Sequence, residues 1–260
     1  MLLMFTGNLF CRRLTVITCI IFPMLTCQAS AQPNSNLHNR HYYEERGDIV
    51  WDVPTEEKAL AFTFDDGPDE KQTLKILEVL EKNDAKATFF VVGSRVKKYP
   101  HILKKELAQG HEVGNHTYHH PSFQNIAPNK VLNEINQTQE EIFAATGHRA
   151  TFFRPPGGQF NEKIVNIAKE NKLQLILWSW HQDTKDWASP GVQKIVNRVL
   201  KNVRNGDIIL MHDCVYHQPQ TAEALSILLP ELKKRGYSFV TVSQLLAHRV
   251  APKTHIKVSQ

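Results

Sequence analysis

Short apolar runs alternate with amphipathic stretches along the chain from about Gly47 onward. The apolar runs cover residues 59–64, 87–92, 111–114, 151–153, 173–180, 207–211 and 237–242. Between them, apolar positions recur with helical spacing over residues 72–82, 100–109, 129–146, 162–171, 192–203 and 221–235. Strands that alternate with helices predict βαβ units and a parallel sheet. About seven such units without a break in composition favour one barrel-like α/β domain.

The first 31 residues have a different pattern. Two arginines precede an apolar stretch over residues 14–25, and a small-residue sequence ends at Ala31. This layout is typical of a secretory signal peptide, and the apolar stretch is short for a transmembrane helix. Lipid attachment at Cys27 is the alternative, but Thr26 is a poor small residue before it. We therefore expect an exported, periplasmic or secreted protein, cleaved after Ala31 and without a stable membrane span.

Cleavage at that point changes both the cysteine content and the charge. It removes three of the four cysteines and leaves Cys214 without a disulfide partner, so the stability of the domain must come from its core. The formal charge falls from +5 to +3, which gives no case for nucleic-acid binding. We interpret residues 32–48 as a polar arm, 49–248 as the domain and 249–260 as a tail, and we expect a monomer.

Residues with catalytic chemistry recur where the predicted strands end. In barrels of this kind the site is built from loops at the carboxyl ends of the strands. The groups are Asp65-Asp66, His116 to His120, Arg154 to Gly158, Asp183 to Trp187, and His212-Asp213. Few residues of these types lie at the starts of the predicted strands. This coincidence predicts one active site at that end of the barrel.

Asp65 and Asp66 place two carboxylates at a strand end that Gly67-Pro68 breaks. Two adjacent anions cost Coulomb energy unless a cation or strong donor offsets it, so the pair indicates a metal, a base, or both. Alternatively, the pair is an Asp-rich turn that caps the next helix.

His116 and His120 are four residues apart. On a helical turn this spacing puts both imidazoles on one side, where they could bind one ion. With one carboxylate of the Asp pair they form a His-His-Asp set, which is the composition of a catalytic zinc site. The alternative is a surface cluster of histidines that includes His119.

Arg154 and Gly157 follow the fourth predicted strand. The guanidinium could orient and ionise one Asp through a bidentate contact, and Gly157-Gly158 leaves a backbone N–H open to act as an oxyanion donor. From the local sequence alone, an ordinary Pro-Pro-Gly-Gly turn with a solvated arginine is the simpler interpretation.

His212 ends a buried run and could protonate a leaving group near neutral pH. An acid such as Asp183 or Asp186 could hold its tautomer and raise its pKa. Tryptophans at the neighbouring loop suggest a saccharide groove, although Trp178 and Trp180 lie inside an apolar run and fit core positions by default. Cys214 is interpreted as a bystander.

Five motifs in this order resemble the polysaccharide deacetylases, the carbohydrate esterases of family 4 with a NodB homology domain. The motifs are TFDDGP at residues 63–68, HTYHH at 116–120, RPPGG at 154–158, DTKDW at 183–187 and LMHD at 210–213. The resemblance spans roughly residues 49–246. It implies a distorted (β/α)7 barrel and a divalent metal, usually zinc with Co²⁺, Mn²⁺ or Ni²⁺ as alternatives. The implied ligands are Asp66, His116 and His120.

The resemblance also implies the remaining roles. Asp65 would be the general base for the attacking water, His212 the acid, and Arg154 the residue that orients Asp65. Asp183 would tune the His212 side. The backbone N–H of Gly157 would stabilise the oxyanion, and Trp187 and Leu210 would wall the acetyl pocket. One departure is Gly157 itself, because the family usually has an aromatic residue there.

The function expected from this resemblance is removal of N-acetyl groups from a GlcNAc-containing polysaccharide. Peptidoglycan is the favoured substrate, because an exported enzyme meets the cell wall first. Chitooligosaccharides and acetylxylan are the alternatives within the enzyme class. An alternative of another class is a catalytically silent sugar-binding module, which would not need both an acid and a base.

Overall fold

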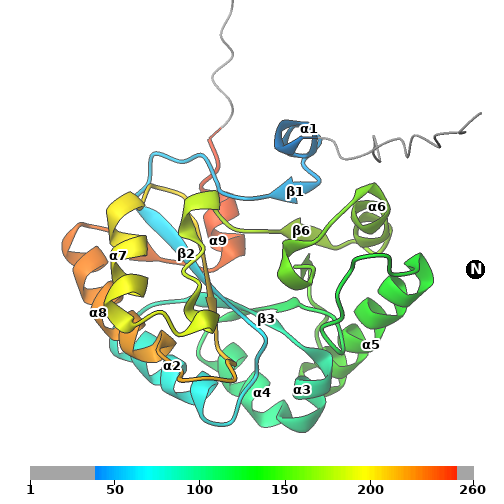
Figure 1. The fold of residues 1–260 in the computed structure, drawn as a ribbon, viewed down its shortest axis with the longest axis horizontal. Coiled ribbons are helices and arrows are strands. Elements are labelled where there is room, and N and C mark those ends of the chain that lie inside the picture. The colour runs from blue at the N-terminus through cyan, green and yellow to red at the C-terminus, as the bar shows by residue number, and fades with distance from the viewer. Residues whose placement is uncertain (1–38, 251–260) are drawn as a thin grey trace, which may run out of the picture. The chain divides into compact units, whose positions relative to one another are not determined.

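The computed structural model describes residues 39–250, which form a curled parallel sheet with helices outside it (Figure 1). The predicted signal peptide, Cys27 and most of the predicted tail lie outside the described residues. The strands are β1 (Ile49–Val50), β2 (Ala59–Asp65), β3 (Ala87–Val91), β4 (Glu112–Asn115), β5 (Phe152–Phe153), β6 (Gln174–Ile176), β7 (Ile208–His212) and β8 (Ser238–Phe239). Seven strands follow the order β1-β6-β5-β4-β3-β2-β7, and β8 pairs with β2 off this path.

The helices cover the outer side of the sheet (Figure 1). They are α1 (Arg40–Glu45), α2 (Gln72–Lys82), α3 (Gly93–Lys98), α4 (Pro100–Ala108), α5 (Pro128–Thr146), α6 (Glu162–Glu170), α7 (Val192–Asn202), α8 (Thr221–Lys234) and α9 (Val242–Ala247). Short 3-10 turns lie at Pro156–Gly158, Trp180–Gln182 and Asp186–Ala188. All seven residues of β2 are buried, because helices cover one face of the parallel sheet and the barrel interior covers the other.

The predicted alternation of strands and helices is confirmed, with differences at the edges. The arm prediction is wrong for its second half, because α1 forms there and Tyr43 is fully buried in the core. The predicted strand over residues 173–180 is too long, since β6 ends at Ile176 and Trp180 begins a 3-10 turn. Trp180 is 87% exposed, so its default assignment to the core is also wrong. The apolar pattern did not predict α3 or α9.

The register of the sheet brings the predicted catalytic ends together. Asp65 at the end of β2 pairs with His212 at the end of β7, and Asn115 at the end of β4 pairs with Phe153 at the end of β5. Because parallel strands end at the same edge, residues 147 positions apart in sequence become neighbours. The loops that carry the five motifs therefore share one end of the barrel.

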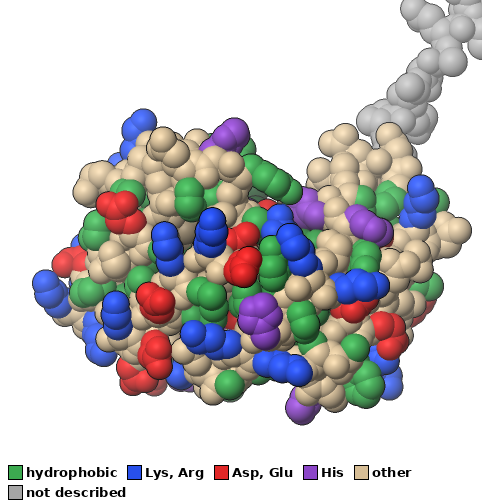
Figure 2. Space-filling model, turned by 90° about the horizontal axis from the view of Figure 1, so that it is seen from below, with side chains coloured by type: hydrophobic (Ala, Val, Ile, Leu, Met, Phe, Trp, Pro, Cys, Tyr) green, Lys and Arg blue, Asp and Glu red, His purple; other side chains and the backbone are tan. Residues whose placement is uncertain are grey.

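Across residues 39–250, no helix is long and apolar enough to cross a membrane. On the face that Figure 2 shows, lysine and arginine side chains are interspersed with acidic ones and do not gather in one patch.

Candidate active site

Asp65 lies at the carboxyl end of β2, and its carboxylate is fixed by Arg154. The Arg154 Nη1 donates to Asp65 Oδ1 at 2.7 Å and to the Thr63 hydroxyl at 2.9 Å. The Asp65 side chain is 5% exposed and that of Arg154 is 0% exposed. This contact fixes the orientation of the Asp65 carboxylate, as a general base requires.

Arg154 is itself held by the sheet, so it is not the solvated arginine of an ordinary turn. Its Nε donates to the Ile176 carbonyl at 3.1 Å and its Nη2 to the Leu177 carbonyl at 2.8 Å. The ring of Phe90 lies 4.0 Å from the guanidinium carbon. These contacts fix the side chain in one orientation, and Arg154 in turn fixes Asp65.

Asp66, His116 and His120 converge on one point. Their candidate ligand atoms all lie within 4.8 Å of one another. Asp66 Oδ1 is 3.5 Å from His116 Nε2 and 3.3 Å from His120 Nε2. Asp66 has a positive φ of 79° where β2 ends, and Asp65 Oδ2 also lies 3.7 Å from His116 Nε2, so both carboxylates face the same centre. The two carboxylates differ in their other contacts, because Asp65 pairs with Arg154 and Asp66 lies against His120.

The tautomer of His116 suits a metal ligand. Its Nδ1 lies 2.6 Å from the Arg154 carbonyl oxygen, which can only accept, so Nδ1 carries a proton and Nε2 is the nitrogen that faces Asp66 and could bind an ion. The two histidines do not share a helical turn, as their spacing suggested. They follow β4 on a loop where Thr117 and His120 have positive φ angles of 68° and 56°, and this loop brings the rings to 5.0 Å.

These residues fit a divalent metal ion. Asp66 Oδ1 is buried and has no hydrogen-bond partner among the described residues. Burial raises the pKa of Asp66, but the three nearby histidines outweigh burial and lower it to about 2. Two imidazoles and one carboxylate are the donor set of catalytic zinc sites that keep positions open for water and substrate.

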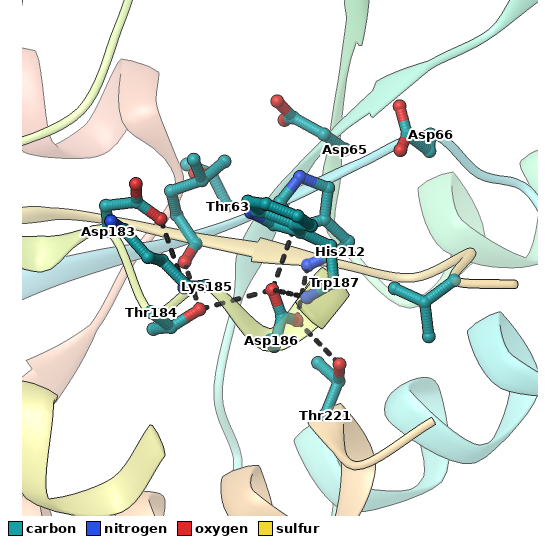
Figure 3. Close-up of polar contacts among 12 residues, drawn as sticks. Thr63, Asp65, Asp66, Asp183, Thr184, Lys185, Asp186, Trp187, His212 and Thr221 are labelled. Carbon is teal, nitrogen blue, oxygen red and sulfur yellow. Dashed lines mark hydrogen bonds and ion pairs between the residues drawn. The ribbon is translucent and has the colours of Figure 1, made fainter. Parts of the chain in front are cut away.

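His212 lies across from Asp65, and its partner is Asp186 (Figure 3). His212 Nδ1 is 2.8 Å from Asp186 Oδ1, and the His212 backbone N–H donates to Asp186 Oδ2 at 2.8 Å. The Thr221 hydroxyl donates to the same carboxylate at 2.6 Å. The assignment of this role to Asp183 is therefore wrong: Asp183 instead accepts from the Lys185 N–H at 3.1 Å.

The Asp186 contact decides the charge of His212. Burial lowers the pKa of His212, but the hydrogen bond and the charge of Asp186, with smaller contributions from Asp65 and Asp66, raise it to about 9. At neutral pH the ring is protonated, and its Nδ1–H is held by Asp186, so Nε2–H is available to a leaving group.

The other predicted residues lie on β7 and in the 3-10 turns that follow β5 and β6. Gly157 has a φ of 60° in the turn that follows β5 and is exposed. Trp187 is 53% exposed, whereas Leu210 is buried in β7 at 4%. Burial raises the pKa of Cys214 to about 12, which keeps the thiol protonated and agrees with its interpretation as a bystander.

Sequence reasoning had left the choice of Asp186 open and had missed Thr63 and Thr221. The Thr63 hydroxyl accepts a hydrogen bond from Arg154, and the Thr221 hydroxyl donates one to Asp186. Thr63 could have been recognised, because a hydroxyl inside an otherwise apolar strand needs a buried partner. Thr221 opens α8, far from any motif, and carries no signal of its own.

The comparisons with known proteins agree with this geometry. The family model for polysaccharide deacetylases matches residues 52–176. The chain is 47% identical to a peptidoglycan-N-acetylglucosamine deacetylase of Bacillus cereus over 210 residues, which cover 81% of this chain and 98% of that protein. The chain therefore belongs to the polysaccharide deacetylase family, a family of hydrolases that remove acetyl groups.

Two further relatives extend the comparison. The peptidoglycan-N-acetylmuramic acid deacetylase PdaC of Bacillus subtilis is 39% identical over 74% of this chain, and the match spans 40% of PdaC. The crystal structure of the Bc1960 peptidoglycan N-acetylglucosamine deacetylase aligns with a TM-score of 0.76 at 32% identity, covering 82% of this chain and all of that one. The distorted (β/α)7 barrel predicted from the motifs is confirmed.

Proposed function

We propose that this protein is a zinc-dependent enzyme that removes acetyl groups from the N-acetylglucosamine residues of peptidoglycan. One observation carries the proposal: Asp65, paired with Arg154, and a protonated His212 end neighbouring strands beside the Asp66, His116 and His120 cluster. Amide hydrolysis needs a base for water and an acid for a poor leaving group, and a sugar-binding module needs neither. The named activities of the Bacillus relatives support peptidoglycan as the substrate.

The proposed reaction follows from these positions. Asp65 takes a proton from the attacking water, and Arg154 holds the carboxylate toward it. His212 gives a proton to the departing nitrogen while Asp186 stabilises the imidazolium. The backbone N–H of Gly157 donates to the oxygen that gains negative charge. A divalent ion held by Asp66, His116 and His120 would supply Lewis-acid chemistry.

Zinc is the proposed ion because the donor set contains two imidazoles and one carboxylate. Co²⁺, Mn²⁺ and Ni²⁺ are the alternatives that the same ligands can bind. We also propose that the protein works outside the cytoplasm, since its N-terminal segment has the layout of a cleaved signal peptide.

Acetate release on three substrates tests the proposed function. Purified protein is stripped with a chelator, reloaded with zinc, and given N-acetylated peptidoglycan, chitooligosaccharides and acetylxylan in parallel. We expect acetate from peptidoglycan at the highest kcat/KM, none from the stripped protein, and recovery on reloading. Faster release from chitooligosaccharides or acetylxylan would assign one of these as the substrate, and full activity without metal would contradict the mechanism.

A further inference from the structure

Of the two proposed histidine ligands, His120 depends more on the backbone of its loop. The His116 side chain is 2% exposed and its ring is held by the Arg154 carbonyl, whereas the His120 side chain is 43% exposed. His120 Nε2 nevertheless lies 3.3 Å from Asp66 Oδ1. Because solvent borders much of this ring, the backbone of residues 117–120 has to keep it beside Asp66. The hydrogen bonds of this loop therefore determine how well an ion is held.

Carbonyl groups of this loop accept hydrogen bonds from the start of α3, which packs beside α5 (Figure 1). The Gly93 N–H donates to the Thr117 carbonyl at 2.9 Å, and the Ser94 N–H donates to the Tyr118 carbonyl at 3.0 Å. A Cβ at Gly93 would lie 2.6 Å from the Tyr118 ring and 2.7 Å from the Thr138 hydroxyl of α5. The glycine therefore lets the loop pack closely against both helices.

The backbone N–H groups of residues 117–120 also need acceptors. The N–H groups at the two ends of this segment donate to the side-chain oxygens of Asn115 and Thr117, at 2.9 and 3.2 Å. The two middle groups, those of Tyr118 and His119, donate to Glu134 Oε2 at 2.9 and 2.7 Å. Among the described residues, no other acceptor bonds to these two groups. The middle of the loop thus depends on one carboxylate from α5.

Glu134 is well placed to hold the loop. Its side chain is 14% exposed, and its Oε1 lies 2.8 Å from His119 Nδ1. Thr117 has a φ of 68°, and successive N–H groups beside a left-handed residue form a concavity that binds an anion. The carboxylate of Glu134 occupies this position, next to the ligand His120. The third histidine of the motif, His119, therefore pairs with Glu134 and lies outside the ligand set.

We propose that Glu134 is a positioning residue of the metal site, whose carboxylate fixes the loop so that the His120 imidazole stays directed at the ion. The proposal rests on the proposed function, because it assumes that an ion binds there. Glu134 is not one of the ligands, so it acts through the backbone of Tyr118 and His119. Without the carboxylate, two N–H groups lose their acceptor and His120 loses its fixed position. The ion should then bind more weakly and dissociate faster.

The zinc affinity of Glu134→Ala tests the proposal. Metal-free protein is titrated with zinc in competition with a chromophoric chelator, and the rate of zinc loss is followed after excess chelator is added. We expect the variant to bind zinc about 10–100-fold more weakly than the wild type, the usual cost of losing a residue that orients a metal ligand. Urea unfolding of the metal-free variant checks that it is folded. Wild-type zinc affinity in folded Glu134→Ala would overturn the proposal.

Glu134→Gln and Glu134→Asp separate geometry from charge, and they decide the matter even if Glu134→Ala does not fold. The glutamine amide oxygen can accept from both N–H groups but carries no charge. Aspartate keeps the charge on a side chain one methylene shorter, which moves the carboxylate away from both groups. We expect Glu134→Gln to bind zinc within about threefold of the wild type, and Glu134→Asp to bind it about tenfold more weakly. The opposite order would assign the effect to charge and contradict the positioning role.

Glu141→Ala is the matched control. Glu141 lies two helical turns further along α5 on the same face, and its Oε1 is 3.6 Å from the Lys97 ammonium of α3. Among the described residues it bonds to none of residues 117–120. Its removal should therefore leave the zinc affinity unchanged. An equal loss in Glu141→Ala would mean that the packing of α5, and not the contact with the loop, sets the affinity.

Zinc binding and acetate release are measured separately, so the two proposals fail in different ways. Wild-type protein that binds zinc but releases acetate from no sugar would refute the proposed function, and the zinc affinities would still decide the role of Glu134. Acetate release, with zinc affinities that neither Glu134→Ala nor Glu134→Asp lowers, would refute the positioning role alone. If the wild type binds neither zinc nor Co²⁺, the positioning role fails together with the metal site.

Discussion

Two pairs of carboxylates differ in their partners: Asp65 and Asp66 have cationic partners, and among the described residues Asp213 and Glu106 have none. Asp65 and Asp66 face Arg154 and the histidine ligands. Asp213 and Glu106 are fully buried. Asp213 packs against Gly67, where a Cβ would lie 2.0 Å from its carboxylate oxygen. No cationic side chain contacts either acid of this second pair among the described residues.

The two pairs differ in protonation as a result. Burial raises the pKa of Asp66, yet the histidines lower it to about 2. Burial likewise raises the pKa of Asp213, and despite a hydrogen bond from Thr73 it reaches about 7. Burial also raises the pKa of Glu106 well above its ordinary value, with Asp213 adding to the shift. Burial alone thus drives a carboxyl toward its neutral form, and a nearby cation decides which carboxyl stays ionised.

The largest expected effect comes from removing the proposed base, Asp65. Asp65→Asn should lower acetate release by about 10²–10⁴-fold, the range that proton transfer by a positioned group contributes. Asp213→Asn is the matched control, because it makes the same chemical change beside the same loop and should keep most of the turnover. Metal content measured on both variants separates loss of the base from loss of the ion. A fully loaded Asp65→Asn variant with wild-type turnover would show that another group is the base.

Removing the cation should cost stability as well as activity. Arg154→Met leaves the buried Asp65 carboxylate without its guanidinium partner, and breaking a buried ion pair typically costs about 3–5 kcal/mol. Urea unfolding should report this loss as a lower midpoint with an unchanged slope. The double variant Asp65→Asn, Arg154→Met removes both charges and should recover part of the loss. If Arg154→Met unfolds at the wild-type midpoint, the ion pair contributes little to the fold.

The partner of His212 can be tested by pH. His212 has a pKa of about 9, so turnover should fall as pH rises through about 9 and the acid loses its proton. In Asp186→Asn, burial still lowers the pKa of His212, but the carboxylate that raises this pKa is gone. The alkaline limb of the pH profile should therefore shift to lower pH. The pH profile of kcat for Asp183→Asn is the control, and its alkaline limb should lie at the same pH as that of the wild type. A shift in Asp183→Asn alone would restore the assignment made from the sequence.

Much of the barrel could be predicted from the sequence because buried parallel strands read as apolar runs and their ends carry the chemistry. The run at residues 59–64 is confirmed as β2, and helix α2 has the predicted bounds Gln72–Lys82. The run at residues 173–180 gave too long a strand, because Trp178 lies in the loop after β6 and Trp180 begins a 3-10 turn. Apolar character alone cannot separate a core tryptophan from one that faces solvent.

The choice between Asp183 and Asp186 shows why part of the site could not be predicted. Both acids lie on one loop after β6, and the sequence gives no reason for either to face His212. The turn at Lys185, with a φ of 53°, and the 3-10 turn at Asp186–Ala188 decide which carboxylate points inward. Glu106 carried no motif at all, and only the packing of α4 reveals a buried acid.

The smallest expected effect on turnover comes from changing Asp213, in the pair that has no cationic partner. A buried neutral Asp213 should instead be detected in how the stability of the protein depends on pH. Asp213 has a pKa of about 7 in the folded state against an ordinary value of 3.8, so folding takes up a proton between these values. The free energy of unfolding should then fall as pH rises from about 4 to about 7, by about 1.4 kcal/mol per pH unit for that one proton. Asparagine mimics the neutral acid and can accept the same Thr73 hydrogen bond, so Asp213→Asn should remove this slope. Urea unfolding of the metal-free proteins at several pH values measures the difference. Parallel curves for the variant and the wild type would mean that Asp213 is ionised in the folded protein, and the contrast between the two pairs would disappear.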